Sequence, residues 1–79
     1  MNIEVNFFAS LVKYKPPGTG KDFWSLACEE GATVGDILRQ SGIPLEDVKI
    51  IFINGLHSKP EVILKDGDRV GIFPLVGGG

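Results

Sequence analysis

The feature that most constrains the fold is a single helical segment in a chain whose other apolar segments have strand patterns. This segment covers residues 33–42. Thr33, followed three residues later by Asp36, is a helix-start signature close to a capping box, with Asp in place of the usual Glu or Gln. Gly42 stops the helix at its usual C-terminal position, and Pro44 prevents it from resuming. A helix of about ten residues is marginal in isolation, so its stability must come from packing.

The spacing of the apolar residues indicates what this helix packs against. Val34, Ile37 and Leu38 fall on one helical face, whereas Arg39 and Gln40 should face water. A single helix with one apolar stripe buries that stripe by covering one face of a single sheet.

The other segments supply such a sheet. Strand patterns cover residues 2–8, 22–28, 48–53 and 69–76, and after the Asn54-Gly55 turn a short segment around residues 56–58 is followed by an apolar segment at residues 62–64. A right-handed crossover through the helix places the last strand parallel to the first at the centre of the sheet, with the second and the short fourth strands at its edges. The sequence therefore predicts an α+β protein with the β-grasp fold. A mixed sheet of four to five strands, covered by one main helix, forms a single domain over residues 1–76.

Two aromatic residues stand out against the strand alternation. Phe8 is apolar on the outward face of the first strand, and Phe73 is on the outward face of the last. They are most simply interpreted as extra core residues. If they lie on the same outward face of adjacent central strands, they instead form an exposed apolar patch suited to partner docking.

Composition and charge exclude several classes of function. A net charge of −2 gives no reason to expect nucleic acid as a partner. No apolar run approaches the ~20 residues that span a bilayer, and no signal peptide is evident, so we expect a soluble cytoplasmic protein without a membrane partner. His57, the one histidine, is not expected to hold a metal. Cys28 is expected to be a small core residue whose neighbours Glu29 and Glu30 raise the pKa of its thiol.

The chain closes on three glycines, Gly77, Gly78 and Gly79. A glycine run adds nothing to a core and has the highest entropy cost of ordering, so we expect residues 77–79 to form a flexible tail. Either this tail simply frays, or its lack of side chains lets it enter a narrow channel and present a terminal carboxylate to another protein.

With this order of elements and this tail, the chain resembles the ubiquitin-like sulfur carriers, namely the small subunit of molybdopterin synthase and the thiamine-pathway carrier. The resemblance covers essentially the whole chain. The segments that carry it are residues 5–9 (Val-Asn-Phe-Phe-Ala), 30–34, 53–55 (Ile-Asn-Gly), 64–70 (Leu-Lys-Asp-Gly-Asp-Arg-Val) and 73–79. The Phe-Phe-Ala start and the Phe-Pro-x-Val segment before the glycines are more similar to the molybdopterin type. Leu75 departs from the family, because a second proline is common there, and so does the third glycine.

The resemblance implies a chemical role for the terminus. A partner similar to ubiquitin-activating enzymes adenylates the terminal carboxylate, here that of Gly79, with ATP and magnesium. Sulfur then displaces AMP and leaves a thiocarboxylate, while Gly77 and Gly78 form a slim arm without β-carbons. The carrier itself is expected to be no enzyme, to supply no catalytic residue or metal ligand, and to bind no cofactor.

The resemblance also implies two partners, the adenylyltransferase and the large subunit of a synthase. The residues expected to bind them are Phe8, His57, Phe73, Pro74, Leu75 and Val76. Three alternatives stay open: a carrier for thiamine, a ubiquitin-like modifier conjugated to target proteins through Gly79, and a β-grasp interaction module that never uses its terminus.

Overall fold

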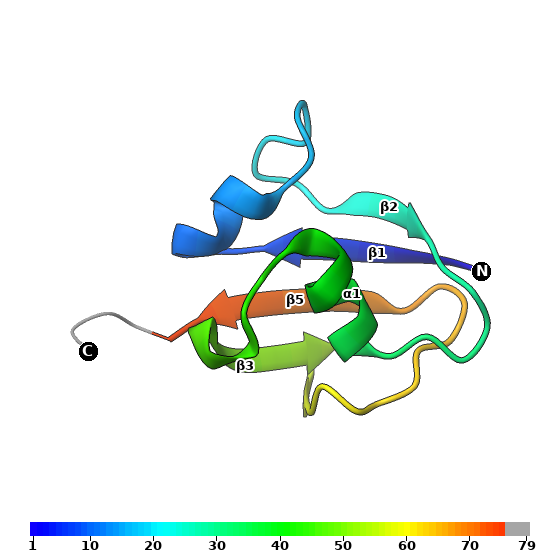
Figure 1. Ribbon diagram of the computed structural model, residues 1–79. Coiled ribbons are helices and arrows are strands. Elements are labelled where there is room, and N and C mark those ends of the chain that lie inside the picture. Colours follow the sequence, from blue (N-terminus) through cyan, green and yellow to red (C-terminus); the bar gives the residue numbers. More distant parts are fainter. Residues whose placement is uncertain (76–79) are drawn as a thin grey trace.

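The computed structural model describes residues 1–75, which form a mixed sheet with one α-helix packed on one face (Figure 1). The strands are β1 (Asn2–Phe7), β2 (Trp24–Ala27), β3 (Val48–Ile53), β4 (Leu56–Ser58) and β5 (Arg69–Pro74). The helices are α1 (Val34–Ser41) and the short 3-10 helices η1 (Ala9–Tyr14) and η2 (Leu45–Asp47). The predicted fold class is therefore confirmed.

The sheet has the predicted topology. Its strand order is β2-β1-β5-β3-β4, so β1 and β5 lie at the centre and run parallel, while the other neighbouring pairs are antiparallel. The register pairs Val5 with Val70 and Phe7 with Ile72. The second and fourth strands form the two edges, as the sequence predicted. Because β1 and β5 are parallel, they end at the same side of the molecule (Figure 1).

Helix α1 has the predicted start and stop. The Thr33 hydroxyl accepts a hydrogen bond from the Asp36 amide (3.2 Å), and the Asp36 carboxylate accepts one from the Thr33 amide (2.9 Å). These reciprocal bonds form a capping box and satisfy two amides that the helix itself leaves without partners. At the other end, Gly42 adopts φ 78°, a left-handed conformation that a glycine enters without steric cost.

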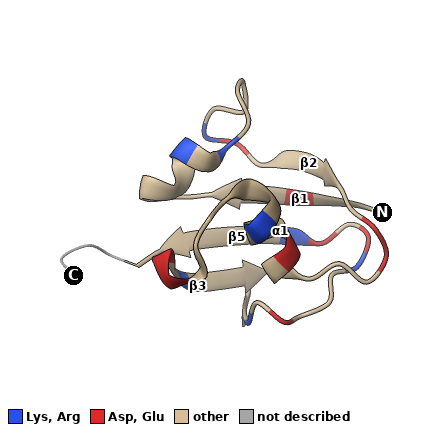
Figure 2. Ribbon diagram, in the orientation of Figure 1, with Lys and Arg blue, Asp and Glu red and all other residues tan. Residues whose placement is uncertain are grey.

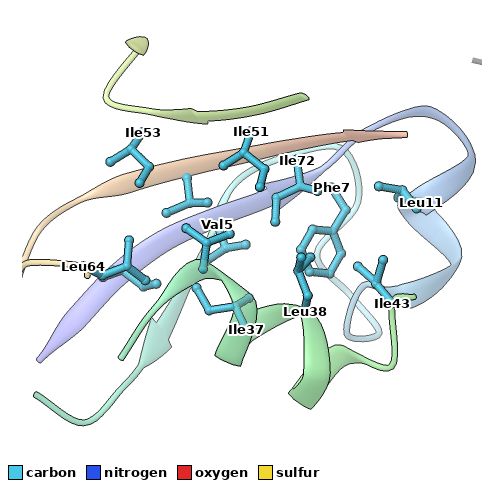
Figure 3. Packing of buried hydrophobic residues seen from close by; sticks show 13 residues of the cluster. Val5, Phe7, Leu11, Ile37, Leu38, Ile43, Ile51, Ile53, Leu64 and Ile72 are labelled. Carbon is cyan, nitrogen blue, oxygen red and sulfur yellow. The ribbon is translucent and has the colours of Figure 1, made fainter. Parts of the chain in front are cut away.

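The core lies between α1 and the sheet (Figure 3). Val34, Ile37 and Leu38 are all buried, which confirms the predicted apolar stripe of the helix. The other buried hydrophobic residues come mainly from β1, β3 and β5: Ile3, Val5, Phe7, Leu11, Ile43, Ile51, Ile53, Leu64, Val70 and Ile72. No helix in residues 1–75 is both long enough and apolar enough to cross a bilayer.

Cys28 follows β2 directly and packs against this core in a partly buried position. Burial raises the pKa of its thiol, because desolvation disfavours the thiolate, and the positive charge of the N-terminal ammonium opposes this effect. The raised pKa agrees with the prediction, but the predicted cause, repulsion by Glu29 and Glu30, is wrong.

Three strands end or begin at other residues than predicted. β1 ends one residue early, because Ala9 takes a positive φ of 52° and turns the chain into η1. β2 is shorter than residues 22–28 at both ends. β5 ends at Pro74, so Leu75 lies beyond the strand, where its amide donates to the Asp47 carbonyl (2.8 Å).

The remainder of the C-terminal segment, residues 76–79, lies outside the described residues. The domain boundary at Val76 and the glycine tail formed by Gly77, Gly78 and Gly79 therefore stay predictions.

Candidate functional site

Five aromatic side chains form a continuous band on the sheet face opposite α1. In the order of the strands across the sheet, this aromatic band consists of Phe23, Phe8, Phe73, Phe52 and His57. Phe23 directly precedes β2 and Phe8 directly follows β1, while the other three lie within β5, β3 and β4. The band therefore has one ring in or directly beside each strand of the sheet.

The centre of the band is the pair Phe8–Phe73. Their rings stack with a centroid separation of 4.3 Å and an interplanar angle of 3°. Neighbouring rings meet this stack edge-on, with Phe23 at 6.2 Å from Phe8 and Phe52 at 5.8 Å from Phe73. His57, at the far edge, lies edge-on to Phe52 at 6.0 Å. Such pairs contribute about 0.5–1.5 kcal/mol each beyond their buried area.

Gly71 makes room for the central stack. A β-carbon at this position would approach the Phe8 ring to 3.3 Å and the Phe73 ring to 3.7 Å. Gly71 is itself buried in the middle of β5. Glycine weakens a strand interior, and here it lets two aromatic rings lie close to the backbone of the central strand.

The band borders a shallow hollow of about 740 Å³ that extends toward the opposite end of the sheet. At that end, the Arg69 guanidinium lies over the Phe23 ring (4.6 Å) and pairs with the Glu4 carboxylate, Nη2 to Oε1, at 3.0 Å. Both charged groups are more than half exposed, so the ion pair itself adds little stability. The face therefore combines an apolar centre with a charged rim, which is the usual composition of a docking surface.

Charged residues are sparse on the sheet. The described strands carry Glu4, Lys49 and Arg69, and most other charges lie in the loops, in the turns and on α1 (Figure 2). In residues 1–75, no three histidine, cysteine or acidic side chains gather as metal ligands. The chemistry available on this face is recognition of an apolar partner surface.

The turn before β5 is built by the Asp-Gly-Asp segment. The Asp68 carboxylate accepts hydrogen bonds from the Asn54 side-chain amide (2.9 Å) and from the backbone amide of Lys65 (2.8 Å). Asp66 accepts from the Asn2 amide (2.7 Å). The Asp68 bonds tie the hairpin after β3 to the turn before β5, the Asp66 bond ties that turn to β1, and both aspartates act as turn residues.

The structure brings most of the predicted partner-binding residues together. Phe8 and Phe73 form the central stack, and His57 is an exposed residue at the rim of the same band. Pro74 and the exposed Leu75 follow Phe73 directly, beside the point where the described chain ends. The geometric condition for a shared outward patch is met, while Val76 and the glycines lie outside the described residues.

Sequence reasoning missed two members of the band, Phe23 and Phe52. The alternation itself contained the signal, because Ile51 and Ile53 face inward on β3 and place Phe52 on the outer face. In the same way, the inward position of Trp24 places Phe23 on the outer face. Only the register between strands shows that both rings join Phe8 and Phe73.

Comparison with known proteins identifies the relatives of this chain. Residues 1–77 match the family described as Mut7-C ubiquitin. The small archaeal modifier protein 3 of Haloferax volcanii is 32% identical, and the alignment covers 100% of each chain. A putative molybdopterin converting factor, subunit 1, from Pyrococcus furiosus has a similar solved structure, with a TM-score of 0.71, 28% identity and coverage of 96% and 99%. Subunit 1 of a Helicobacter pylori molybdopterin-converting factor, solved as a complex with subunit 2, shares the fold at a TM-score of 0.60 and 23% identity, with full coverage of both chains.

Proposed function

Because the chain belongs to the Mut7-C ubiquitin family and is similar to a small archaeal modifier protein and a putative molybdopterin converting factor subunit, we propose that it carries sulfur on its terminus as a thiocarboxylate of Gly79. The observation that supports this most directly is the position of the aromatic band. Its central residue Phe73 lies only two residues before Leu75, from which the chain leads into the glycines. A partner that binds the band therefore holds the tail next to its own surface.

The proposed chemistry activates a poor electrophile. The Gly79 carboxylate attacks the α-phosphorus of ATP, which releases pyrophosphate and gives an acyl adenylate with AMP as the leaving group. Sulfide displaces AMP to give the thiocarboxylate directly; a persulfide first gives an acyl disulfide, which a thiol then reduces. ATP and magnesium act in the activating partner, and the absence of β-carbons at Gly78 and Gly79 leaves the acyl carbon accessible.

We assign two partners to the aromatic band. The first is an adenylyltransferase similar to ubiquitin-activating enzymes, and the second is the large subunit of a molybdopterin synthase. The second is supported by the relatives, since the Pyrococcus furiosus protein is named as a putative molybdopterin converting factor subunit and the Helicobacter pylori subunit 1 was solved with its subunit 2. The cycle would run in the cytoplasm, with molybdenum or tungsten cofactor biosynthesis as the pathway that receives the sulfur.

A second candidate function is conjugation to other proteins through Gly79. The observation that favours it is the match to small archaeal modifier protein 3 over the full length of both chains. The two functions share the adenylation step and differ in the nucleophile, which is sulfur for the carrier and a lysine amine for the modifier.

Intact mass spectrometry of the protein from its own host cells tests both functions. A thiocarboxylate adds about 16 Da to the chain, because sulfur replaces one oxygen. Isopeptide remnants of the tail on lysines of other proteins indicate the modifier. If neither is found, and a variant lacking Gly78 and Gly79 supports the growth of the host as well as the wild type does, the terminus has no chemical role and both proposals fail.

A further inference from the structure

The ammonium group of Lys15 has a complete set of hydrogen-bond acceptors. Its Nζ donates to the side-chain oxygen of Asn6 (2.6 Å), to the carbonyl of Gly20 (2.7 Å) and to the carbonyl of Asp22 (3.0 Å). An ammonium has three protons to donate, so this arrangement uses all of them. The group also lies 5.6 Å from the centre of the Trp24 ring. We refer to these four partners as the Lys15 site.

Asn6 anchors this site to the sheet. It is only 2% exposed, although the alternation of β1 places it on the polar side of the strand. Its side-chain oxygen accepts from Lys15, and its amide nitrogen donates to the carbonyl of Lys21 (2.9 Å). The buried asparagine therefore connects the central strand β1 to the loop of residues 15–23 through both ends of its amide.

Within the loop itself, the Thr19 hydroxyl donates to the Pro16 carbonyl (3.0 Å) and the Asp22 amide donates to the Thr19 carbonyl (3.2 Å). Gly18 and Gly20 adopt positive φ values of 87° and 59°, and the loop contains no hydrophobic residue of the core. The Lys15 ammonium binds three oxygen atoms, two of them backbone carbonyls of this loop. Such charge-assisted hydrogen bonds can offset the conformational entropy that the loop loses when it is ordered.

The loop leads directly into the aromatic band. Asp22, whose carbonyl binds Lys15, is followed by Phe23, the ring that extends the band to the β2 edge and lies under Arg69. Phe23 therefore lies in the chain between Asp22 and Trp24, two members of the Lys15 site.

We propose that Lys15 is a positioning residue for the docking surface: its ammonium orders the loop of residues 15–23 and thereby holds Phe23 against Phe8. This inference rests on the proposed function only where it concerns partner binding. It also has a consequence that does not depend on any partner. Because its protons are all donated, the Lys15 amine must leave the site before it can react, and it is a poor acceptor for acylation.

The first test compares the reactivity of two lysines in the same part of the chain. Lys13 is exposed and its ammonium lies beside the Tyr14 ring (5.4 Å), which makes it a matched control. With a limiting acetylating ester, we expect peptide mass spectrometry to show acetylation of Lys15 at least tenfold slower than that of Lys13. Equal rates would overturn the proposal.

The second test removes the charge. In Lys15→Met, we expect the nuclear Overhauser contacts between the rings of Phe8 and Phe23 to be lost, whereas Lys13→Met should retain them. Retention of these contacts in Lys15→Met would show that the loop orders itself without the ammonium, and the proposal would fail.

The third test links Lys15 to docking through a double-mutant cycle. We expect Lys15→Met to weaken binding to the adenylating enzyme of the host at least fivefold. In a chain that already carries Phe23→Ala, it should change the affinity less than twofold, because Lys15 acts through Phe23. If Lys15→Met weakens binding by the same factor with and without Phe23→Ala, Lys15 does not act through Phe23 and the proposal fails. If the wild-type chain does not bind the enzyme at all, the proposed function fails, while the ring contacts still decide the role of Lys15.

Discussion

Phe73→Ala is the substitution that best separates docking from folding. It removes the central ring of the aromatic band, including the stack on Phe8 at 4.3 Å and the edge contact with Phe52 at 5.8 Å. Two aromatic pairs at about 0.5–1.5 kcal/mol each give a loss of about 1–3 kcal/mol in the free energy of unfolding. We expect the lower half of this range, because Phe73 is only partly buried and lies outside the core cluster.

The effect on binding should be larger than the effect on folding. An aromatic residue at the centre of an interface costs about 2 kcal/mol or more when it is truncated to alanine. Since about 1.4 kcal/mol corresponds to a factor of ten in an equilibrium constant, the affinity for the adenylating enzyme should fall roughly 30-fold. The chain should remain folded, and its terminal carboxylate should remain available.

Ile72→Val is the matched control. Ile72 is the neighbour of Phe73 in β5 but is fully buried on the α1 face, and this substitution costs about 0.5–1.5 kcal/mol of stability. Urea unfolding measures stability in both variants, and isothermal titration with the adenylating enzyme measures affinity. We expect similar stabilities and a loss of affinity in Phe73→Ala alone. If both variants bind equally well, or lose affinity in proportion to stability, the ring is an extra core residue and the docking interpretation is wrong.

The other predictions concern the turn, the strand glycine, the thiol and the terminus. Asp68→Ala removes two exposed hydrogen bonds, whose donors water can then satisfy, and should lower the unfolding free energy by about 1 kcal/mol in urea titrations. Gly71→Ala should separate the central stack, seen as altered ring shifts in NMR spectra, and weaken binding to the adenylating enzyme. Because burial raises the pKa of the Cys28 thiol, the unfolded chain loses the thiol proton at a lower pH than the folded chain does. The free energy of unfolding should therefore fall as the pH rises above 9.0, and it should fall less in Cys28→Ala. Adding one residue after Gly79 should abolish adenylation in a pyrophosphate-exchange assay without changing the melting temperature.

Local signals made most of the fold predictable. The capping residues Thr33 and Asp36 and the stop at Gly42 determine α1 through their immediate neighbours, and the period-two alternation determines which strand face is buried. The strand order followed from the position of one helix among these strands. Helix caps and strand alternation depend on residues that are close in the chain, so they can be recognised in a single sequence.

The unpredicted features depend on segments that meet only after folding. Phe23 and Phe52 join the band through cross-strand register, which the alternation within one strand does not specify. Asn6 and Lys15 are nine residues apart, and nothing in their spacing indicates that a loop returns over β1 and pairs them. Phe8 and Phe73 were therefore visible in the sequence as unusual outward aromatic residues, whereas the membership of Phe23 and Phe52 required the arrangement of the strands.

The distribution of phenylalanines over the two sheet faces is the strongest physical argument for a docking role. The chain has five phenylalanines, and only Phe7 belongs to the core, where it packs edge-on against Trp24 at 5.0 Å. The other four belong to the aromatic band on the face that α1 leaves open, where they bury one another only in part. Stability alone favours placing large apolar rings in the core, because burying apolar surface away from water contributes about 25 cal/mol per Å² of that surface. A chain that keeps most of its phenylalanines only partly buried on the open sheet face, around a glycine that lets two of them stack, has the composition of a surface completed by a partner.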